Sequence, residues 1–402
     1  MNKGNYIISQ IFHFLTITVL YLREILLLLG ANAGFVSTMF YLFIILCAIW
    51  MGIQSFVLGK EKNSERQLLG IVYLILSVLI IYTTYNMKSV VETQLNEAIG
   101  ELIILLLFYG LYTNRYPYSI SMLKLNTVFN MLFAFLLFLK SFSPSSYLNG
   151  DLVYGYLNPN STGLASLITV FCIFIGIKSF KNSTFRITGY ICAVLAAFIC
   201  FKSGSRSAII ALLFSLIIVL YKKITIRNSR NFRLSIKFLV AVQLFVMLYP
   251  FLWSMLYAVV TNHNIQILGK PLFSNRELIW AYMISILTKE PFVTHLGESF
   301  VYGSGSHNVF MSIWWTYGII AVICFHIILY KLFRQINNRI NTRMDMQIVI
   351  CLVSLLSSMS FEALLFSGGV NFTFRVFYLG FFIGNNDLMS LYRSNELYGN
   401  NI

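Results

Sequence analysis

Long apolar runs separated by short polar connections dominate this sequence, and they restrict what it can fold into. Most of the runs approach the ~20 residues that an α-helix needs to cross a bilayer. Inside lipid, backbone amides and carbonyls must find their hydrogen-bond partners within the protein, which favours helices. The runs fall at residues 6–22, 34–58, 67–85, 98–112, 122–140, 159–177, 184–201, 206–221, 234–260, 309–330, 346–366 and 373–384. The sequence therefore predicts an all-α integral membrane protein with about twelve transmembrane helices.

The composition agrees with this class and bears on the partners. Apolar residues make up 58% of the chain and charged residues 11%, against about 45–50% and about 25% in soluble domains. The formal net charge of +15 would suit nucleic acid. In a membrane protein, an excess of Lys and Arg in cytoplasmic loops explains the charge instead. We therefore predict membrane lipids as the surroundings and no nucleic-acid partner.

The positions of the basic residues predict the orientation of the chain. With a cytoplasmic N-terminus, about two thirds of the 29 Lys and Arg residues fall in cytoplasmic loops, the largest group lying between residues 222 and 237. We therefore expect a multi-pass protein of the cytoplasmic membrane with both termini in the cytoplasm. Residues 1–402 would form a single polytopic membrane domain.

One long polar segment, at about residues 261–306, separates the ninth run from the tenth and is expected to form an external catalytic loop. Within it, Ser274-Asn-Arg276-Glu277 fits a capping box and is followed by apolar residues at helical spacing. This pattern predicts an amphipathic helix on the outer membrane surface, with Trp280 at the interface. A water-facing segment over helix ends is a natural place for polar chemistry in a chain that lipid otherwise surrounds.

Three helices predicted to run from outside to inside begin with polar sequences at the outer face. The three openings are Asn158-Pro-Asn160, Ser205-Arg206-Ser207 and Ser306-His307-Asn308. Helix N-termini carry free N–H groups and a positive dipole end, so they suit anions such as phosphate. A cation at this position is unfavourable for the helix itself, and Arg206 therefore needs another reason to be there.

Each opening also has a purely structural explanation. Asn-Pro-Asn is an ordinary helix start, an arginine at a membrane boundary can extend to lipid headgroups, and His307 can be an interfacial residue. The occurrence of all three on one face favours a binding site. The candidate substrate-binding residues are Asn158, Asn160, Ser205, Trp280 and Asn308.

The candidate catalytic residues are two arginines and one histidine. Arg206 and Arg276, together with the helix N-termini, suit a pyrophosphate that is held or that departs. His307, where the helix dipole favours neutral imidazole, suits a base that takes a proton from an attacking hydroxyl. The sequence has no Asp-x-Asp, His-Glu-x-x-His, Walker or Gly-x-Ser-x-Gly motif, so neither a metal nor a cofactor is predicted. This inventory suggests substitution at a sugar carbon that bears a lipid-linked pyrophosphate.

The order of these motifs resembles the Wzy-type O-antigen and capsular polysaccharide polymerases, in the O-antigen ligase-like superfamily of membrane glycosyltransferases. The shared motifs are Asn158-Pro-Asn160-x-x-Gly163, Ser205-Arg206-Ser207-Ala208, Arg276-x-x-x-Trp280, Gly297, and His307-Asn308 followed by Gly318. The resemblance covers roughly residues 158–318. The family often has glycine before the loop arginine, where this chain has Asn275.

The resemblance implies a metal-independent glycosyltransferase whose donor is an undecaprenyl-pyrophosphate-linked oligosaccharide. Arg206 and Arg276 would contact the pyrophosphate, and His307 would act near the acceptor. The implied product is O-antigen, capsule or exopolysaccharide, polymerised on the outer face of the cytoplasmic membrane. A chain-length regulator and a flippase are the candidate partner proteins.

Two other functions fit part of the sequence. An O-antigen ligase would use the same chemistry to move finished glycan to another acceptor, but the external loop is shorter than in many ligases. A polysaccharide flippase or transporter also commonly has twelve helices, although transporters tend to place charges at broken helices in mid-membrane. Here Glu101 and Glu362 are the acidic residues well within apolar runs. The polymerase is the preferred interpretation.

The orientation can be tested with single cysteines introduced at Asn264, Lys270, Arg227 and Arg339 in a background without native cysteines. We expect a membrane-impermeant thiol reagent to label positions 264 and 270 in intact cells, and positions 227 and 339 only after permeabilisation, because of the basic-residue bias. Labelling of position 227 in intact cells would reverse the orientation and remove the basis for an external site.

Overall fold

The structure is a computed structural model that describes part of the chain. The described residues are 3–30, pairs of residues between 35 and 50, 63–85, 119–148, 150–153, 159–226, 234–260, 265–267, 270–271, 276–295, 307–338, 340 and 343–358. Of the predicted runs, 98–112 and 373–384 lie outside this part, 34–58 is described only in pieces, and 346–366 is described only as far as residue 358.

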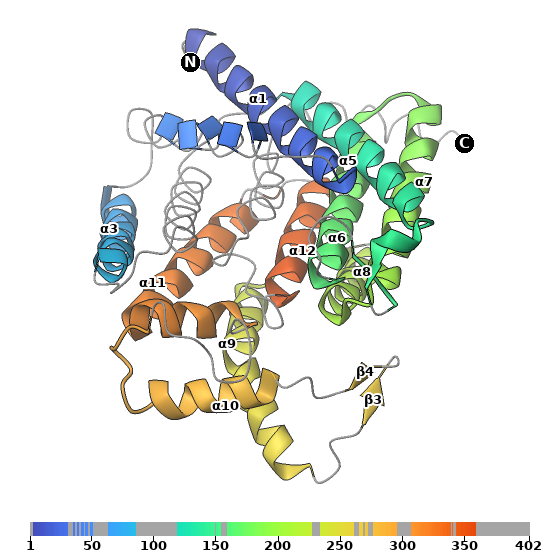
Figure 1. The fold of residues 1–402 in the computed structure, drawn as a ribbon. Coiled ribbons are helices and arrows are strands. Elements are labelled where there is room, and N and C mark those ends of the chain that lie inside the picture. Colours follow the sequence, from blue (N-terminus) through green and yellow to red (C-terminus); the bar gives the residue numbers. More distant parts are fainter. Residues whose placement is uncertain are drawn as a thin grey trace.

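The described part is mostly helical (Figure 1). Its helices are α1 (Lys3–Leu28), α3 (Asn63–Tyr85), α5 (Ile120–Lys140), α6 (Pro159–Gly176), α7 (Ser183–Lys202), α8 (Arg206–Ile226), α9 (Ile236–Val259), α10 (Arg276–Leu287), α11 (Val309–Asn338) and α12 (Arg343–Ser358). Its strands form two antiparallel hairpins, β1 (Tyr147–Leu148) with β2 (Asp151–Leu152) and β3 (Gln266–Ile267) with β4 (Lys270–Pro271). These short hairpins lie between helices and are an addition to the predicted all-α fold.

Six helices are long and apolar enough to cross a membrane, as judged by length and composition. They are Gln10–Leu28, Ile120–Lys140, Pro159–Ser179, Ser183–Lys202, Ile236–Val259 and Val309–Asn338. Shorter apolar helices cover Gly70–Thr83 and Asp345–Ser358. Within the described residues the structure thus supports a helical membrane protein with six candidate spans, and the predicted count of twelve is not reached there.

Large apolar side chains cover much of the outer surface of the helices. Val194 on α7 is 68% exposed, and Ile217 on α8 is 64% exposed. Such an extensive apolar surface would be a liability in water, but in a bilayer it is solvated by acyl chains. The core, in contrast, is centred on α6, which packs against α5, α7 and α8.

A buried polar network holds α1 against α5. The Tyr21 hydroxyl donates to Asn126 Oδ1 over 3.0 Å, and Asn130 Nδ2 donates to that hydroxyl and to the Asn126 carbonyl. Nearby on α1, Arg23 and Glu24 form an ion pair of 2.7 Å with the carboxylate fully buried. These two residues lie inside the helix, which continues to Leu28, beyond the end of the predicted run at 22.

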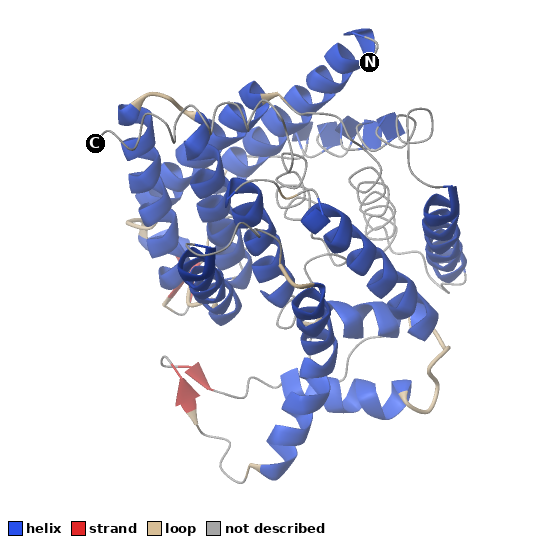
Figure 2. Ribbon diagram, turned by 180° about the vertical axis from the view of Figure 1, so that it is seen from behind, coloured by secondary structure: helices blue, strands red, loops and turns tan. Residues whose placement is uncertain are grey.

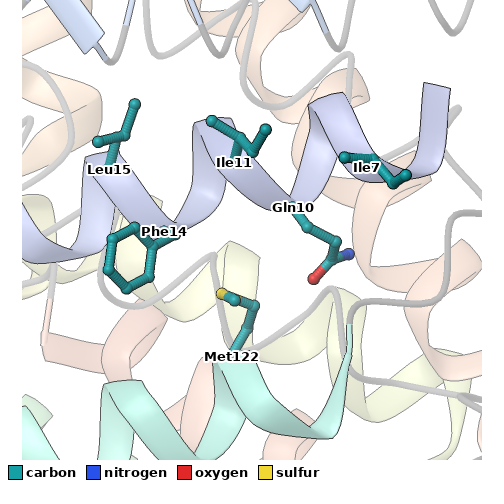
Figure 3. A pocket seen from close by; sticks show the side chains of 6 residues that line it. All are labelled: Ile7, Gln10, Ile11, Phe14, Leu15 and Met122. Carbon is teal, nitrogen blue, oxygen red and sulfur yellow. The ribbon is translucent and has the colours of Figure 1, made fainter. Parts of the chain in front are cut away.

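An apolar pocket of about 330 Å³ lies at the N-terminal ends of α1 and α5 (Figure 3). Gln10 is the polar residue in its lining, beside the apolar residues Ile7, Ile11, Phe14, Leu15 and Met122. In Figures 1 and 2, α10 and the hairpin β3–β4 both lie at the end of the molecule away from the start of α1. The pocket is therefore separate from the part of the molecule where the predicted site residues are found.

The helix predicted at residues 309–330 is longer than expected and is kinked. Gly318 in α11 has φ 78° and ψ 174°, and the helix continues beyond the kink to Asn338. The Ile319 amide donates to the Pro291 carbonyl over 2.9 Å instead of to the helix. A Cβ on Gly318 would lie 3.1 Å from the Phe292 carbonyl oxygen. Glycine fits this position because it tolerates both the positive φ and the close approach.

Glycine also allows the start of α6 to contact the turn between α7 and α8. A Cβ on Gly163 would collide with the Ser205 side chain and would lie 2.6 Å from Ser203 Oγ. Both serines are fully buried. Two of the three polar helix openings are therefore in direct contact.

The same substitution at two glycines tests this packing. Gly163→Ala should destabilise the protein by about 1–3 kcal/mol, because the buried serines must move. The matched control is Gly70→Ala on α3, where the site is exposed and a Cβ meets nothing within 4 Å; it should stabilise the helix by roughly 0.5–1 kcal/mol. Apparent melting temperatures in detergent measure both effects, and a Gly163→Ala protein as stable as the parent would contradict the contact.

Candidate functional site

The opening of α8 is built from a tight serine-rich turn. Gly204 has φ 63°, the left-handed conformation that glycine adopts readily. Ser203 Oγ donates to the Cys200 carbonyl over 2.7 Å and accepts from the Ser205 amide over 3.3 Å. The Ser205 and Ser207 hydroxyls are 3.1 Å apart. The predicted substrate-binding residue Ser205 thus lies buried against α6, with its hydroxyl beside that of Ser207.

Arg206 and Arg276, which are distant in sequence, are neighbours in the structure. Arg206 is the first residue of α8 and Arg276 the first residue of α10. The two guanidinium groups are within electrostatic range of each other, and both side chains are partly exposed. Two like charges repel, so their placement at one point calls for an anionic neighbour.

Tyr249 of α9 and Glu277 of α10 complete this group. Tyr249 is within electrostatic range of both arginines and of Glu277, and Glu277 is in turn within range of Arg206. We call these four residues, Arg206, Tyr249, Arg276 and Glu277, the arginine cluster. It joins three helices, and it contains both predicted catalytic arginines.

Trp280 lies inside the protein rather than at the membrane interface that its sequence position predicts. Its side chain is 1% exposed and packs edge-on against Tyr249, with ring centroids 5.6 Å apart. One turn later on α10, Met283 joins the same buried cluster, together with Trp315 of α11. The apolar face of α10 therefore packs against α9 and α11. Through its contact with Tyr249, Trp280 is the buried neighbour of the arginine cluster.

Asn308 is the N-cap of α11, and it also anchors that helix to α9. Its Oδ1 accepts from the amides of Phe310 and Met311 over 3.0 and 3.1 Å. Its Nδ2 donates to the Val246 carbonyl over 2.9 Å.

Pro250 lies inside α9 and has no N–H, so it cannot donate to the carbonyl of Val246, four residues earlier. The predicted substrate-binding residue Asn308 therefore has a structural role: it satisfies the carbonyl that Pro250 leaves open.

His307 directly precedes this anchor and has an unusual backbone. With φ 51°, it is the non-glycine residue with positive φ in the described part of the chain, and its side chain is partly exposed. Such a conformation costs of order 1–3 kcal/mol and persists where neighbouring contacts impose it. Here the contact is made by the residue after His307: the Asn308 side chain bonds the carbonyl of Val246, which lies three positions before Tyr249 on α9. His307 is thus held beside α9, next to the residue that bonds Val246.

The segment after α10 contacts the N-terminal part of α11. The His295 amide donates to the Trp315 carbonyl over 2.8 Å, and its imidazole stacks on the Trp315 indole with centroids 4.5 Å apart. Trp314 Nε1 donates to the Pro291 carbonyl over 3.1 Å. Residues 291–295, the strap, therefore tie α10 to the start of α11 and to its kink.

Some predicted features lie outside the described residues. These are Asn158, Ser274, Asn275, Gly297 and residues 303–306. Asn160 is described as the second residue of α6, where it is partly exposed at the end that contacts Ser205. Much of the predicted external loop is likewise undescribed, apart from β3–β4, α10 and the strap.

Tyr249 is the member of the arginine cluster that sequence analysis missed. It stacks on Trp253 with centroids 5.5 Å apart, and Phe245 lies one turn earlier at 5.8 Å. Because residues four apart lie on one face of a helix, this spacing indicates an aromatic face of α9 beside Pro250. It does not by itself distinguish an aromatic facing lipid from one facing two arginines on other helices.

Among the described residues, no three His, Cys, Asp or Glu side chains gather as a metal ion would require. Comparisons of the sequence and structure with protein-family models, with curated proteins and with solved structures find no match. The site is therefore interpreted from its own geometry.

A double-mutant cycle tests the anchor between α9 and α11. Asn308→Ala removes the cap and leaves the Val246 carbonyl without its donor, which should cost about 1–3 kcal/mol of stability. In a Pro250→Ala background the regained N–H can bond that carbonyl, so the same Asn308→Ala change should cost about 1 kcal/mol less. Apparent stabilities of the four proteins in detergent give the coupling. Equal costs in both backgrounds would show that Asn308 acts on α11 alone.

Proposed function

We propose that this protein is a polysaccharide polymerase of the cytoplasmic membrane. It joins undecaprenyl-pyrophosphate-linked oligosaccharide repeat units on the outer face, giving O-antigen, capsule or exopolysaccharide. The proposal includes the finer topology that the sequence predicts: about twelve spans, cytoplasmic termini, and an external loop at about residues 261–306. A flippase would supply the lipid-linked units, and a chain-length regulator would limit the product.

The observation that carries the proposal is the proximity of Arg206 and Arg276. A site with two partly exposed guanidinium groups suits a ligand with at least two negative charges, and planar guanidinium pairs well with phosphate oxygens. The surrounding helices are suited to lipid, so a charged group attached to a lipid tail fits better than a free polar metabolite. A lipid-linked pyrophosphate meets both conditions.

The reaction follows from this assignment. The hydroxyl of the acceptor sugar attacks the anomeric carbon of the donor, a new C–O bond forms, and the bond to the pyrophosphate oxygen breaks. The electron pair leaves with undecaprenyl pyrophosphate, whose charge the arginines stabilise. His307 takes the hydroxyl proton, and the strained backbone of this residue is consistent with a side chain held in a working position.

Variants of His307 test the proposal. Polymer formation is measured with purified protein and lipid-linked repeat units, in the presence of EDTA. His307→Gln keeps hydrogen bonding but not basicity, so turnover should fall about 10²–10⁴-fold. His307→Gly relieves the positive φ and should leave the protein at least as stable as the parent, with a similar loss of turnover.

The arginines provide the second arm of this experiment. Arg206→Ala and Arg276→Ala should abolish polymer at normal protein levels, and Lys should restore only part of it because a guanidinium fork is lost. Near-normal turnover of the His307→Gln variant would show that His307 is not the base. Activity that EDTA abolishes and a divalent ion restores would refute the metal-independent mechanism.

A further inference from the structure

Glu277 is a buried carboxylate that the proposed reaction does not use. Its side chain is 1% exposed, although it is the second residue of α10 and lies next to the partly exposed Arg276. The Ser254 hydroxyl donates to the Glu277 carbonyl over 3.3 Å, which ties this turn of α10 to α9. Burying a carboxylate is costly unless cations or donors compensate it. Arg206 lies within electrostatic range of Glu277 and Arg276 directly precedes it in the chain, so two cations are available to compensate it.

A favourable position in a helix does not account for this burial. An acidic residue in the first turn interacts with the helix dipole, but this effect is small and operates equally well at an exposed position. Glu277 instead interacts with Arg206, which belongs to α8, and with Tyr249 of α9. Its charge therefore acts across three helices rather than within its own.

The charges of the arginine cluster explain what this arrangement does. Two guanidinium groups and one carboxylate leave one net positive charge when the site holds no ligand. Without the carboxylate, two positive charges would be held together at a partly desolvated point, where their mutual repulsion is larger than in water. An anion that binds the arginines must then compete with a negative charge that is already present.

We infer that Glu277 is the resident counter-anion of Arg206 and Arg276, and that a diphosphate binds by partly replacing it. As a positioning residue, Glu277 keeps the two arginines together before the ligand arrives. It also weakens the hold on the diphosphate, which favours release of the lipid pyrophosphate after each transfer. The diphosphate class rests on the proposed function, whereas the replacement of a resident carboxylate rests on the arginine cluster.

The test measures binding of inorganic pyrophosphate to the full-length protein in detergent at constant ionic strength. The dissociation constant is obtained from the rise of melting temperature with ligand concentration. Glu277→Gln keeps the shape and removes the charge, so the dissociation constant should fall by about tenfold. Glu277→Asp, which keeps the charge, should remain near the parent value. The matched control is Glu290→Gln, an exposed residue beyond the end of α10, which should change nothing.

If Glu277 only supported the fold, removing its charge would not lower the dissociation constant for pyrophosphate. Unchanged or weaker pyrophosphate binding by Glu277→Gln would overturn the inference. If this variant unfolds when purified alone, bound pyrophosphate should substitute for the missing charge and restore its melting transition. A variant that remains unfolded in saturating pyrophosphate would also overturn it.

The pyrophosphate-binding measurement can be interpreted independently of the polymerisation assay. Tighter pyrophosphate binding without any polymer formation would reject the polymerase and retain the role of Glu277. If the protein is an active polymerase and Glu277→Gln changes neither pyrophosphate binding nor turnover, the polymerase is retained and the role of Glu277 is rejected. If both proposals hold, Glu277→Gln should lower KM for the donor and also lower kcat, because release becomes slower.

Discussion

In a lipid-solvated helix, a carbonyl that loses its amide partner must find another donor, and this requirement determines how α9 meets α11. Pro250 leaves the Val246 carbonyl open, and Asn308 closes it with a side-chain N–H. An unpaired buried carbonyl would cost about 1–3 kcal/mol or more. The same asparagine caps α11, so one side chain fixes the start of that helix, the backbone of His307 and the distance of both from Tyr249.

The local features of the fold could be predicted from the sequence, because they depend on neighbouring residues. Apolar runs predicted the long helices, and the polar openings at Pro159, Arg206 and Asn308 predicted where three helices begin. The kink at Gly318 was not predicted. A glycine within a helix can be tolerated, and the break here requires the Pro291 carbonyl, which only the folded strap supplies.

The candidate site was predictable as a set of residue types but not as an arrangement. Arg206 and Arg276 were predicted as site residues because they are cations in unfavourable or exposed positions. Only the fold, in which α10 packs against α9 and α8 against α6 and α12, brings them within electrostatic range of each other. Trp280 was placed at a membrane interface because helical periodicity shows which face is apolar without showing what covers it. The contact of Asn308 with Val246 could not be predicted for a similar reason, since the two residues lie 62 positions apart.

The kink at Gly318 sets the direction of the first part of α11, and the two arginines lie on helices with different packing partners. The N-terminal part of α11, the strap and α10 are joined through Trp315, Met283 and the bonds of Pro291, and α10, which begins at Arg276, also packs against α9. Arg206 is carried by α8, which packs with α6 and α12. A shift of α10 relative to α8 would therefore change the spacing of the guanidinium groups. The separation of the two arginines depends on two different sets of helix contacts.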